Sequence, residues 1–85
     1  MNLEDVADNR RASACCDASK ACAMLGEFEM AQQLAFQAID KASATLQQYV
    51  IPRCVMIAQA IQQKTPENSY AAAIADYAHL ALQRS

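Results

Sequence analysis

The side chains in this sequence with the greatest capacity for chemistry are four cysteines and a single histidine. Thiolates bind metals and act as nucleophiles, and imidazole carries protons near neutral pH. Three of the cysteines, Cys15, Cys16 and Cys22, lie close together, whereas Cys54 and His79 lie farther along the chain. The short paired spacing of zinc sites, Cys-x-x-Cys, is absent. The pattern therefore predicts free thiols that pack as small apolar groups, with no metal and no cofactor.

A disulfide between Cys15 and Cys22 is excluded by helix geometry. Cys15 and Cys22 share one helix face, but their Cα atoms would lie about 10 Å apart along the helix, too far for a bridge. A bridge from Cys54 to Cys15 or to Cys22 would require an oxidising environment. The first residues, Met1 to Asp5, are acidic and lack the basic start and apolar stretch of a signal peptide. We therefore expect a cytoplasmic protein with reduced thiols.

The sequence offers little for catalysis. His79 lies between Ala78 and Leu80, and Asp76 precedes it by three residues, close enough to pair across one helical turn. No serine or cysteine can be placed beside them, and no glycine-rich loop could hold a phosphate. We therefore expect that the protein is not an enzyme. An enzyme or metal carrier that uses the cysteines and His79 is the third of three hypotheses.

Composition predicts the fold class. The chain has 85 residues, enough for one domain, and its hydrophobic share of 54% is mostly alanine, the strongest helix former. Turn residues are scarce, with one glycine and two prolines. We therefore expect an all-α fold, a small antiparallel helical bundle with a thin core. The net charge is −2 and the basic residues are scattered, which argues against nucleic acid as a partner. The apolar runs are far shorter than the ~18 residues of a membrane span.

The sharpest structural signal is Gly26, the only glycine. It predicts the end of a first helix and a reversal into a second, together a hairpin over residues 3–50. The expected apolar stripe of the first helix is Val6, Ala14, Ala18, Ala21 and Leu25. The expected face of the second helix is Phe28, Ala31, Leu34, Ala35, Ala38, Ile39 and Ala42, followed without a clear stop to about Val50.

Two prolines divide the rest of the chain. Pro52 marks a break or a kink, after which a third helix is expected over residues 52–64. Thr65, Pro66 and Glu67 have the residue types of an N-cap and first turn, which predicts a fourth helix over residues 66–83. No linker separates these parts, so residues 1–85 are expected to form a single helical domain.

Residues 12–44 resemble one tetratricopeptide (TPR) repeat. The family has a glycine at the end of its first helix, an aromatic residue two positions later, and small residues along its second helix. Gly26, Phe28, Ala31, Ala35 and Ala38 occupy these places. The chain departs from the pattern where the family has an aromatic residue (Cys15), a Leu-Gly pair (Ala18 and Ser19) and a closing proline (Ser43). No second repeat is expected, because Pro52 would fall inside its first helix.

The resemblance implies a binding surface. In TPR proteins the inner face of the first helix contacts ligands, and its positions here are Cys16, Lys20, Ala23 and Met24. Only Lys20 is polar, so a clamp for a terminal carboxylate is not expected. An apolar groove along Ala23 and Met24 that accepts an amphipathic helix fits better. The alternative is that these residues pack against the fourth helix.

Two further resemblances are weaker in their coverage. Residues 26–38 and 53–58 resemble the second and third helices of the MIT (microtubule interacting and trafficking) domain, which has three helices and so lacks the expected fourth. The size also resembles that of small TPR-like chaperones of secretion systems. Tyr49, Tyr70 and Tyr77 are additional candidate contact residues, since tyrosine is enriched at interfaces.

The leading hypothesis is a non-catalytic protein-interaction module, a small cytoplasmic adaptor or chaperone that binds a helical segment of a protein partner. The second hypothesis is a structural bundle that associates with itself, most simply as a homodimer that covers exposed alanine and leucine side chains.

Overall fold

The computed structural model describes residues 3–45 and 48–84, with side chains placed for residues 11–44 and 48–84. Over these ranges the chain forms four α-helices and no strand: α1 (Leu3–Met24), α2 (Phe28–Thr45), α3 (Val50–Lys64) and α4 (Ser69–Arg84). The all-α helical bundle predicted from composition is therefore confirmed.

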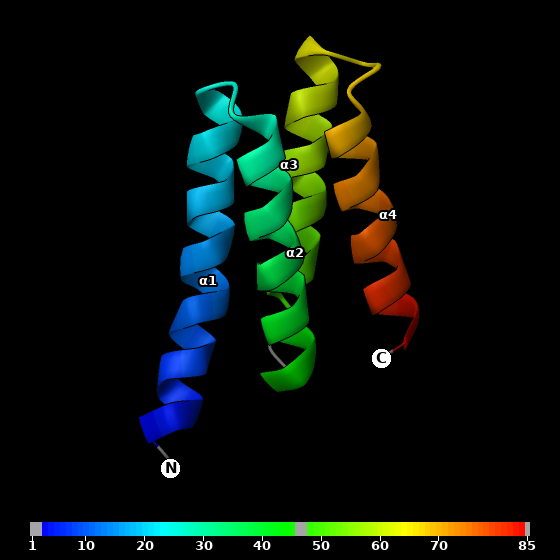
Figure 1. Ribbon diagram of the computed structural model, residues 1–85. Helices are drawn as coiled ribbons and strands as arrows, with labels where there is room; N and C mark the ends of the chain where they lie inside the picture. Colours follow the sequence, from blue (N-terminus) through cyan, green and yellow to red (C-terminus); the bar gives the residue numbers. More distant parts are fainter. Residues whose placement is uncertain (1–2, 46–47, 85) are drawn as a thin grey trace.

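The helices form two hairpins that lie against each other (Figure 1). α1 packs mainly on α2, and α3 packs mainly on α4. Between the hairpins α1 also contacts α3, and α2 contacts both α3 and α4, so α1 and α3 form one layer and α2 and α4 the other. Within the described ranges α1 does not reach α4. The sequence-based alternative in which Cys16, Lys20, Ala23 and Met24 pack against the fourth helix is therefore wrong.

The reversal at Gly26 follows a known helix-ending geometry. Gly26 has a φ of 82°, the left-handed region that glycine enters without steric cost. The Gly26 N–H donates to the Ala23 carbonyl at 3.2 Å, and the Glu27 N–H donates to the Cys22 carbonyl at 2.8 Å. This pair of bonds is the Schellman motif, which satisfies the carbonyls that the end of α1 leaves without helical partners.

The boundary between α2 and α3 differs from the predicted one. α2 ends at Thr45 instead of about Val50, and α3 begins at Val50, before Pro52. Pro52 is the third residue of α3, where an N–H would have no helical partner, so its missing donor costs nothing there. The Ile51 N–H bonds to the Gln48 carbonyl at 3.1 Å, in the turn that leads into the helix.

The boundary between α3 and α4 also differs from the predicted one. Thr65 ends α3 instead of starting α4, since its N–H donates to the Ile61 carbonyl at 2.8 Å. Pro66 and Glu67 lie in the turn, and α4 begins at Ser69. Asn68 is its N-cap, because the side-chain oxygen accepts the Ala71 N–H at 3.1 Å. The sequence does not predict Asn68 as the N-cap, because Thr65, Pro66 and Glu67 form a stronger helix-start signal.

α1 and α2 meet through small side chains. Their buried residues are Ala12, Cys16 and Ser19 on α1 and Ala31, Ala35, Ala38 and Ala42 on α2, with Ile39 beside them. Side chains this small let two helices approach closely. Ser19, fully buried, donates to the Ala31 carbonyl at 2.7 Å, so its hydroxyl is not left without a partner.

The stripe predicted for the first helix is wrong. Ala14, Ala18 and Ala21 are exposed, and Leu25 is 79% exposed, beyond the end of α1. Val6 lies among the residues whose side chains are not described. The apolar residues of α1 are spread almost evenly around its axis, so periodicity does not identify the buried face.

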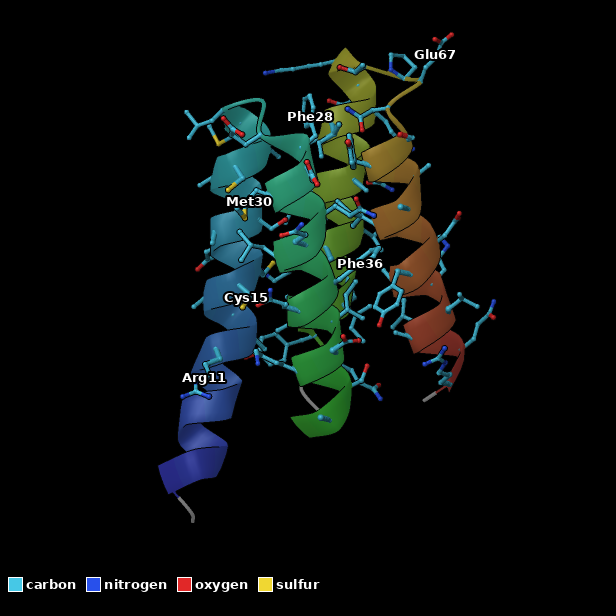
Figure 2. All side chains as sticks on the ribbon, viewed as in Figure 1. Arg11, Cys15, Phe28, Met30, Phe36 and Glu67 are labelled. Carbon is cyan, nitrogen blue, oxygen red and sulfur yellow. The ribbon has the colours of Figure 1, made fainter. Side chains whose placement is uncertain are left out.

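The bulkier core lies between the two hairpins. Its largest side chains are Ile39, Val50, Ile51, Ile57, Ile61 and Ile74, from α2, α3 and α4. On the α2–α4 side Phe36 stacks on Tyr77 with ring centroids 4.4 Å apart. Figure 2 shows Phe36 on the α4 side of α2. None of the described helices is both long enough and apolar enough to cross a membrane.

Replacing Gly26 with alanine should destabilise the fold by about 1–2 kcal/mol, because an L-residue resists the left-handed conformation. No atom lies within 4 Å of the place that a Cβ would take, so strain alone sets this cost. Gly26→Asn should lose less, since asparagine tolerates that conformation. Urea unfolding of both variants measures the difference, and equal stability of Gly26→Ala and wild type would contradict the assigned turn.

Replacing Ala35 with leucine should force α1 and α2 apart and cost about 1–3 kcal/mol, because the closely packed contact has no room for added carbons. Ala44→Leu is the matched control, since Ala44 is exposed on the same helix and its replacement should change stability by less than about 0.5 kcal/mol. Thermal and urea unfolding compare them. Equal stabilities would mean that this contact is not closely packed.

Candidate functional site

A groove of about 340 Å³ runs between α1 and α3. α1 supplies Cys16, Asp17, Lys20, Ala23 and Met24, and Phe28 lies at the start of α2. α3 supplies Arg53, Met56, Ile57, Ala60, Ile61 and Lys64. The groove exists because α1 and α3 are neighbours that touch far less than the helices within each hairpin.

Helical spacing explains how each wall is built. Arg53, Met56, Ala60 and Lys64 recur at intervals of three and four residues and so form one stripe along α3, with a basic residue at each end. At 1.5 Å per residue this stripe is about 16 Å long, or three helical turns. Lys20 and Met24 repeat the same spacing on α1.

The groove has an apolar interior and an exposed methionine on each side of its rim. Cys16, Ile57 and Ile61 are buried and close its floor, and Phe28 packs half-buried against the core at the turn end. Figure 2 shows Phe28 at this end of the bundle, beside the turn between α1 and α2. Met24 and Met56, one on each wall, are 76% and 66% exposed. Methionine side chains adapt to irregular partners, so this rim suits a docking surface.

One ion pair joins the walls. The Arg53 Nη2 lies 2.7 Å from the Asp17 Oδ1, and Arg53 also donates from Nη1 to the Ser13 hydroxyl at 3.4 Å. Both charged side chains are largely exposed, so the pair adds at most about 1 kcal/mol to stability. It does fix the Arg53 guanidinium against α1 and so sets the spacing of the walls at that end.

The charge of the groove is opposite to that of the chain. Three basic residues line it, Lys20, Arg53 and Lys64, whereas among the described side chains Asp17 is the only acidic residue that does. Asp17 is already paired with Arg53. Among the described side chains neither Lys20 nor Lys64 has an ion-pair partner. The groove is thus positive in a protein whose net charge is −2.

Cys16, at the floor of the groove, interacts with the thiol of Cys54, which is buried on α3 and does not line the groove. The pKa of Cys16 is lowered, first by a hydrogen bond from the Cys54 thiol and further by the nearby charge of Arg53, although burial acts in the opposite direction. The pKa of Cys54 is raised by the same hydrogen bond and by burial. Cys54 Sγ also donates to the Ala35 carbonyl at 4.0 Å, so this thiol lies between Cys16 and the backbone of α2. All four cysteines are free thiols.

The predicted contact residues lie in separate parts of the structure. Cys16, Lys20, Ala23 and Met24 all line the groove. None of the three tyrosines does. Tyr49 lies 59% exposed in the turn before α3, and Tyr70 lies in the first turn of α4 at the surface.

Tyr77 lies on the other layer of the bundle. Its hydroxyl donates to the Asp40 carboxylate, and this bond together with burial raises the pKa of Tyr77. It borders a second hollow of about 290 Å³, whose other lining residues are Ile39, Asp40, Ser43, Gln48, Ala81 and Arg84. Because the ring stacks on Phe36 and the hydroxyl is bonded, Tyr77 has a structural role in joining α2 to α4.

The groups considered for catalysis do not assemble. His79 and Asp76 are both exposed on α4, and no ion pair joins them in the described part of the chain. Within the same part, no three histidine, cysteine, aspartate or glutamate side chains gather closely enough to hold a metal ion.

Sequence reasoning found one wall of the groove and missed the other. No contact role is predicted from the sequence for Arg53, Ala60 or Lys64, although their spacing with Met56 indicates a mixed apolar and basic face. Pro52 argues against a second TPR repeat, and without that repeat the resemblance implies no ligand-facing positions on the third helix.

None of the protein-family models, curated proteins and solved structures that were compared with this chain matches it.

Cys54→Ala should raise the pKa of Cys16, because it removes the hydrogen bond that stabilises the Cys16 thiolate most. Alkylation of Cys16 by iodoacetamide should then require higher pH, since only the thiolate reacts. Tandem mass spectrometry across a pH series resolves Cys16 from its neighbours. Cys22→Ala, on the same helix, should leave the Cys16 profile unchanged. An unshifted profile in Cys54→Ala would rule out the thiol–thiol bond.

Proposed function

We propose that this protein is a non-catalytic interaction module that binds a helical segment of a partner protein in the groove between α1 and α3. The observation that carries the proposal is the groove itself, an apolar trough about three helical turns long with an exposed methionine on each wall. Recognition of a helix in such a trough uses apolar anchors spaced along one helix face.

The size of the groove supports a helix over a small metabolite. Its volume of about 340 Å³ is at the lower end for small-molecule sites, and it is an open trough instead of an enclosed cavity. Covering Met24 and Met56 removes apolar surface from water, worth about 1.5–3 kcal/mol for each fully buried side chain. A partner helix can cover both walls at once.

The resemblance of residues 12–44 to a TPR repeat belongs to this proposal. In that family the inner face of the first helix contacts the ligand. Support comes from the arrangement of the two hairpins, whose first helices, α1 and α3, are the two that line the groove. We propose a role as a small cytoplasmic adaptor, or as a chaperone that shields an apolar helix of its partner.

Met24→Glu should abolish partner capture, because a carboxylate would be desolvated against an apolar helix. The helicity and melting temperature should stay near wild type, since Met24 is 76% exposed. Met30→Glu is the matched control: Met30 is 50% exposed on α2, does not line the groove, and should retain the partner. Affinity capture from host lysate with quantitative mass spectrometry compares the variants, with circular dichroism for folding.

Two results would contradict this function. Loss of folding in Met24→Glu would place Met24 in the core. Equal capture by Met24→Glu and Met30→Glu would move the binding surface elsewhere. Light scattering of the wild-type protein addresses self-association: a dimer that Met24→Glu dissociates would make a second copy of this chain the occupant of the groove.

A further inference from the structure

We infer that the occupant of the groove is an acidic amphipathic helix, with small or aliphatic side chains on one face and carboxylates on both flanks of that face. This inference rests on the proposed function and specifies the chemistry of the partner. Its basis is the charge arrangement of the groove, which is independent of the apolar trough.

The basic side chains stand where flanking carboxylates would lie. Lys20 is on the α1 wall and Lys64 is at the turn end of the α3 wall, so a helix between the walls has an ammonium group on either side. Neither lysine has an ion-pair partner among the described residues. Carboxylates on both flanks of the helix would therefore complement groups that the protein itself leaves uncompensated.

Arg53 contributes differently from the lysines. Its guanidinium is held by Asp17 and Ser13, so it closes the opposite end of the α3 stripe without offering a full positive charge. The uncompensated charge therefore increases from the Arg53 end toward Lys64. A helix with its carboxylates concentrated near the Lys20 and Lys64 positions gains most from this arrangement.

The surrounding surface adds selectivity. Apart from Asp17, the acidic side chains that the structure describes lie outside the groove, where they outnumber the described basic side chains, so the described surface around the groove carries an excess of negative charge. An acidic partner helix is thus repelled by the rest of the surface and attracted only at the groove, which favours one docking position. A basic helix would be attracted elsewhere and repelled at the groove.

The test uses three synthetic peptides of about 15 residues, long enough for three helical turns and a few flanking residues. All carry leucine and alanine on one face, and their flanking positions are glutamate, glutamine or lysine. Fluorescence anisotropy with the full chain should show the glutamate peptide binding about ten-fold more tightly than the lysine peptide, with glutamine between them. Raising salt from about 50 to 300 mM should reduce this preference, because exposed charges are screened.

Charge reversal locates the effect. Lys20→Glu and Lys64→Glu should each weaken binding of the glutamate peptide about five-fold and improve binding of the lysine peptide. Arg84→Glu changes the net charge equally at the end of α4, away from the groove, and should change neither affinity. Circular dichroism of each variant confirms that the helices remain folded.

The outcomes separate the two proposals. Equal binding of the three peptides, abolished by Met24→Glu, would overturn the acidic partner while the groove remains a helix-binding site. Absence of peptide binding together with capture that Met24→Glu abolishes would show that the occupant has another chemistry. Absence of peptide binding together with capture insensitive to Met24→Glu would overturn both proposals.

Discussion

The structure depends on the close contact between α1 and α2. The side chains that the described part of α1 buries are alanine, cysteine and serine, and the buried side chains of α2 are mainly alanine. Such residues contribute little apolar area each, so the contact is stable only if the helices approach closely over several turns. Gly26 makes this possible, because its left-handed backbone turns the chain back within the three residues between α1 and α2.

This contact explains why a groove exists. α1 uses its smallest side chains against α2 and reaches α3 only in part, through the buried Cys16 and the Arg53–Asp17 pair. The larger isoleucines lie between the other three helices, where they hold the second hairpin against α2. The Phe36–Tyr77 stack therefore joins α2 to α4, whereas the apolar groove runs along the α1–α3 side.

The composition of the groove is also notable in a chain that has few large apolar side chains. A chain with few large apolar residues nevertheless leaves Met24 and Met56 largely in solvent, above a floor of Cys16, Ile57 and Ile61. Three basic residues gather along the same trough although acidic residues outnumber basic ones in the chain. The fold does not depend on these exposed methionines, which lie mostly outside the core. Nor does it depend on Lys20 and Lys64, which have no ion-pair partner in the described part of the chain. Their coincidence is what makes this face a binding surface in our proposal.

Sequence alone determined the helical class, the turn at Gly26 and the buried face of α2, because alanine content, glycine conformation and helical spacing are local properties. It also identified the α1 wall of the groove through the TPR resemblance. It misplaced the end of α2 and the starts of α3 and α4, because Pro52 and Thr65 each fit two positions near a helix boundary. The buried stripe of α1 and the pairing of Cys16 with Cys54 were decided by tertiary packing. Alanine is compatible with either a buried or an exposed face, so only the neighbouring helices determine which side of α1 is covered.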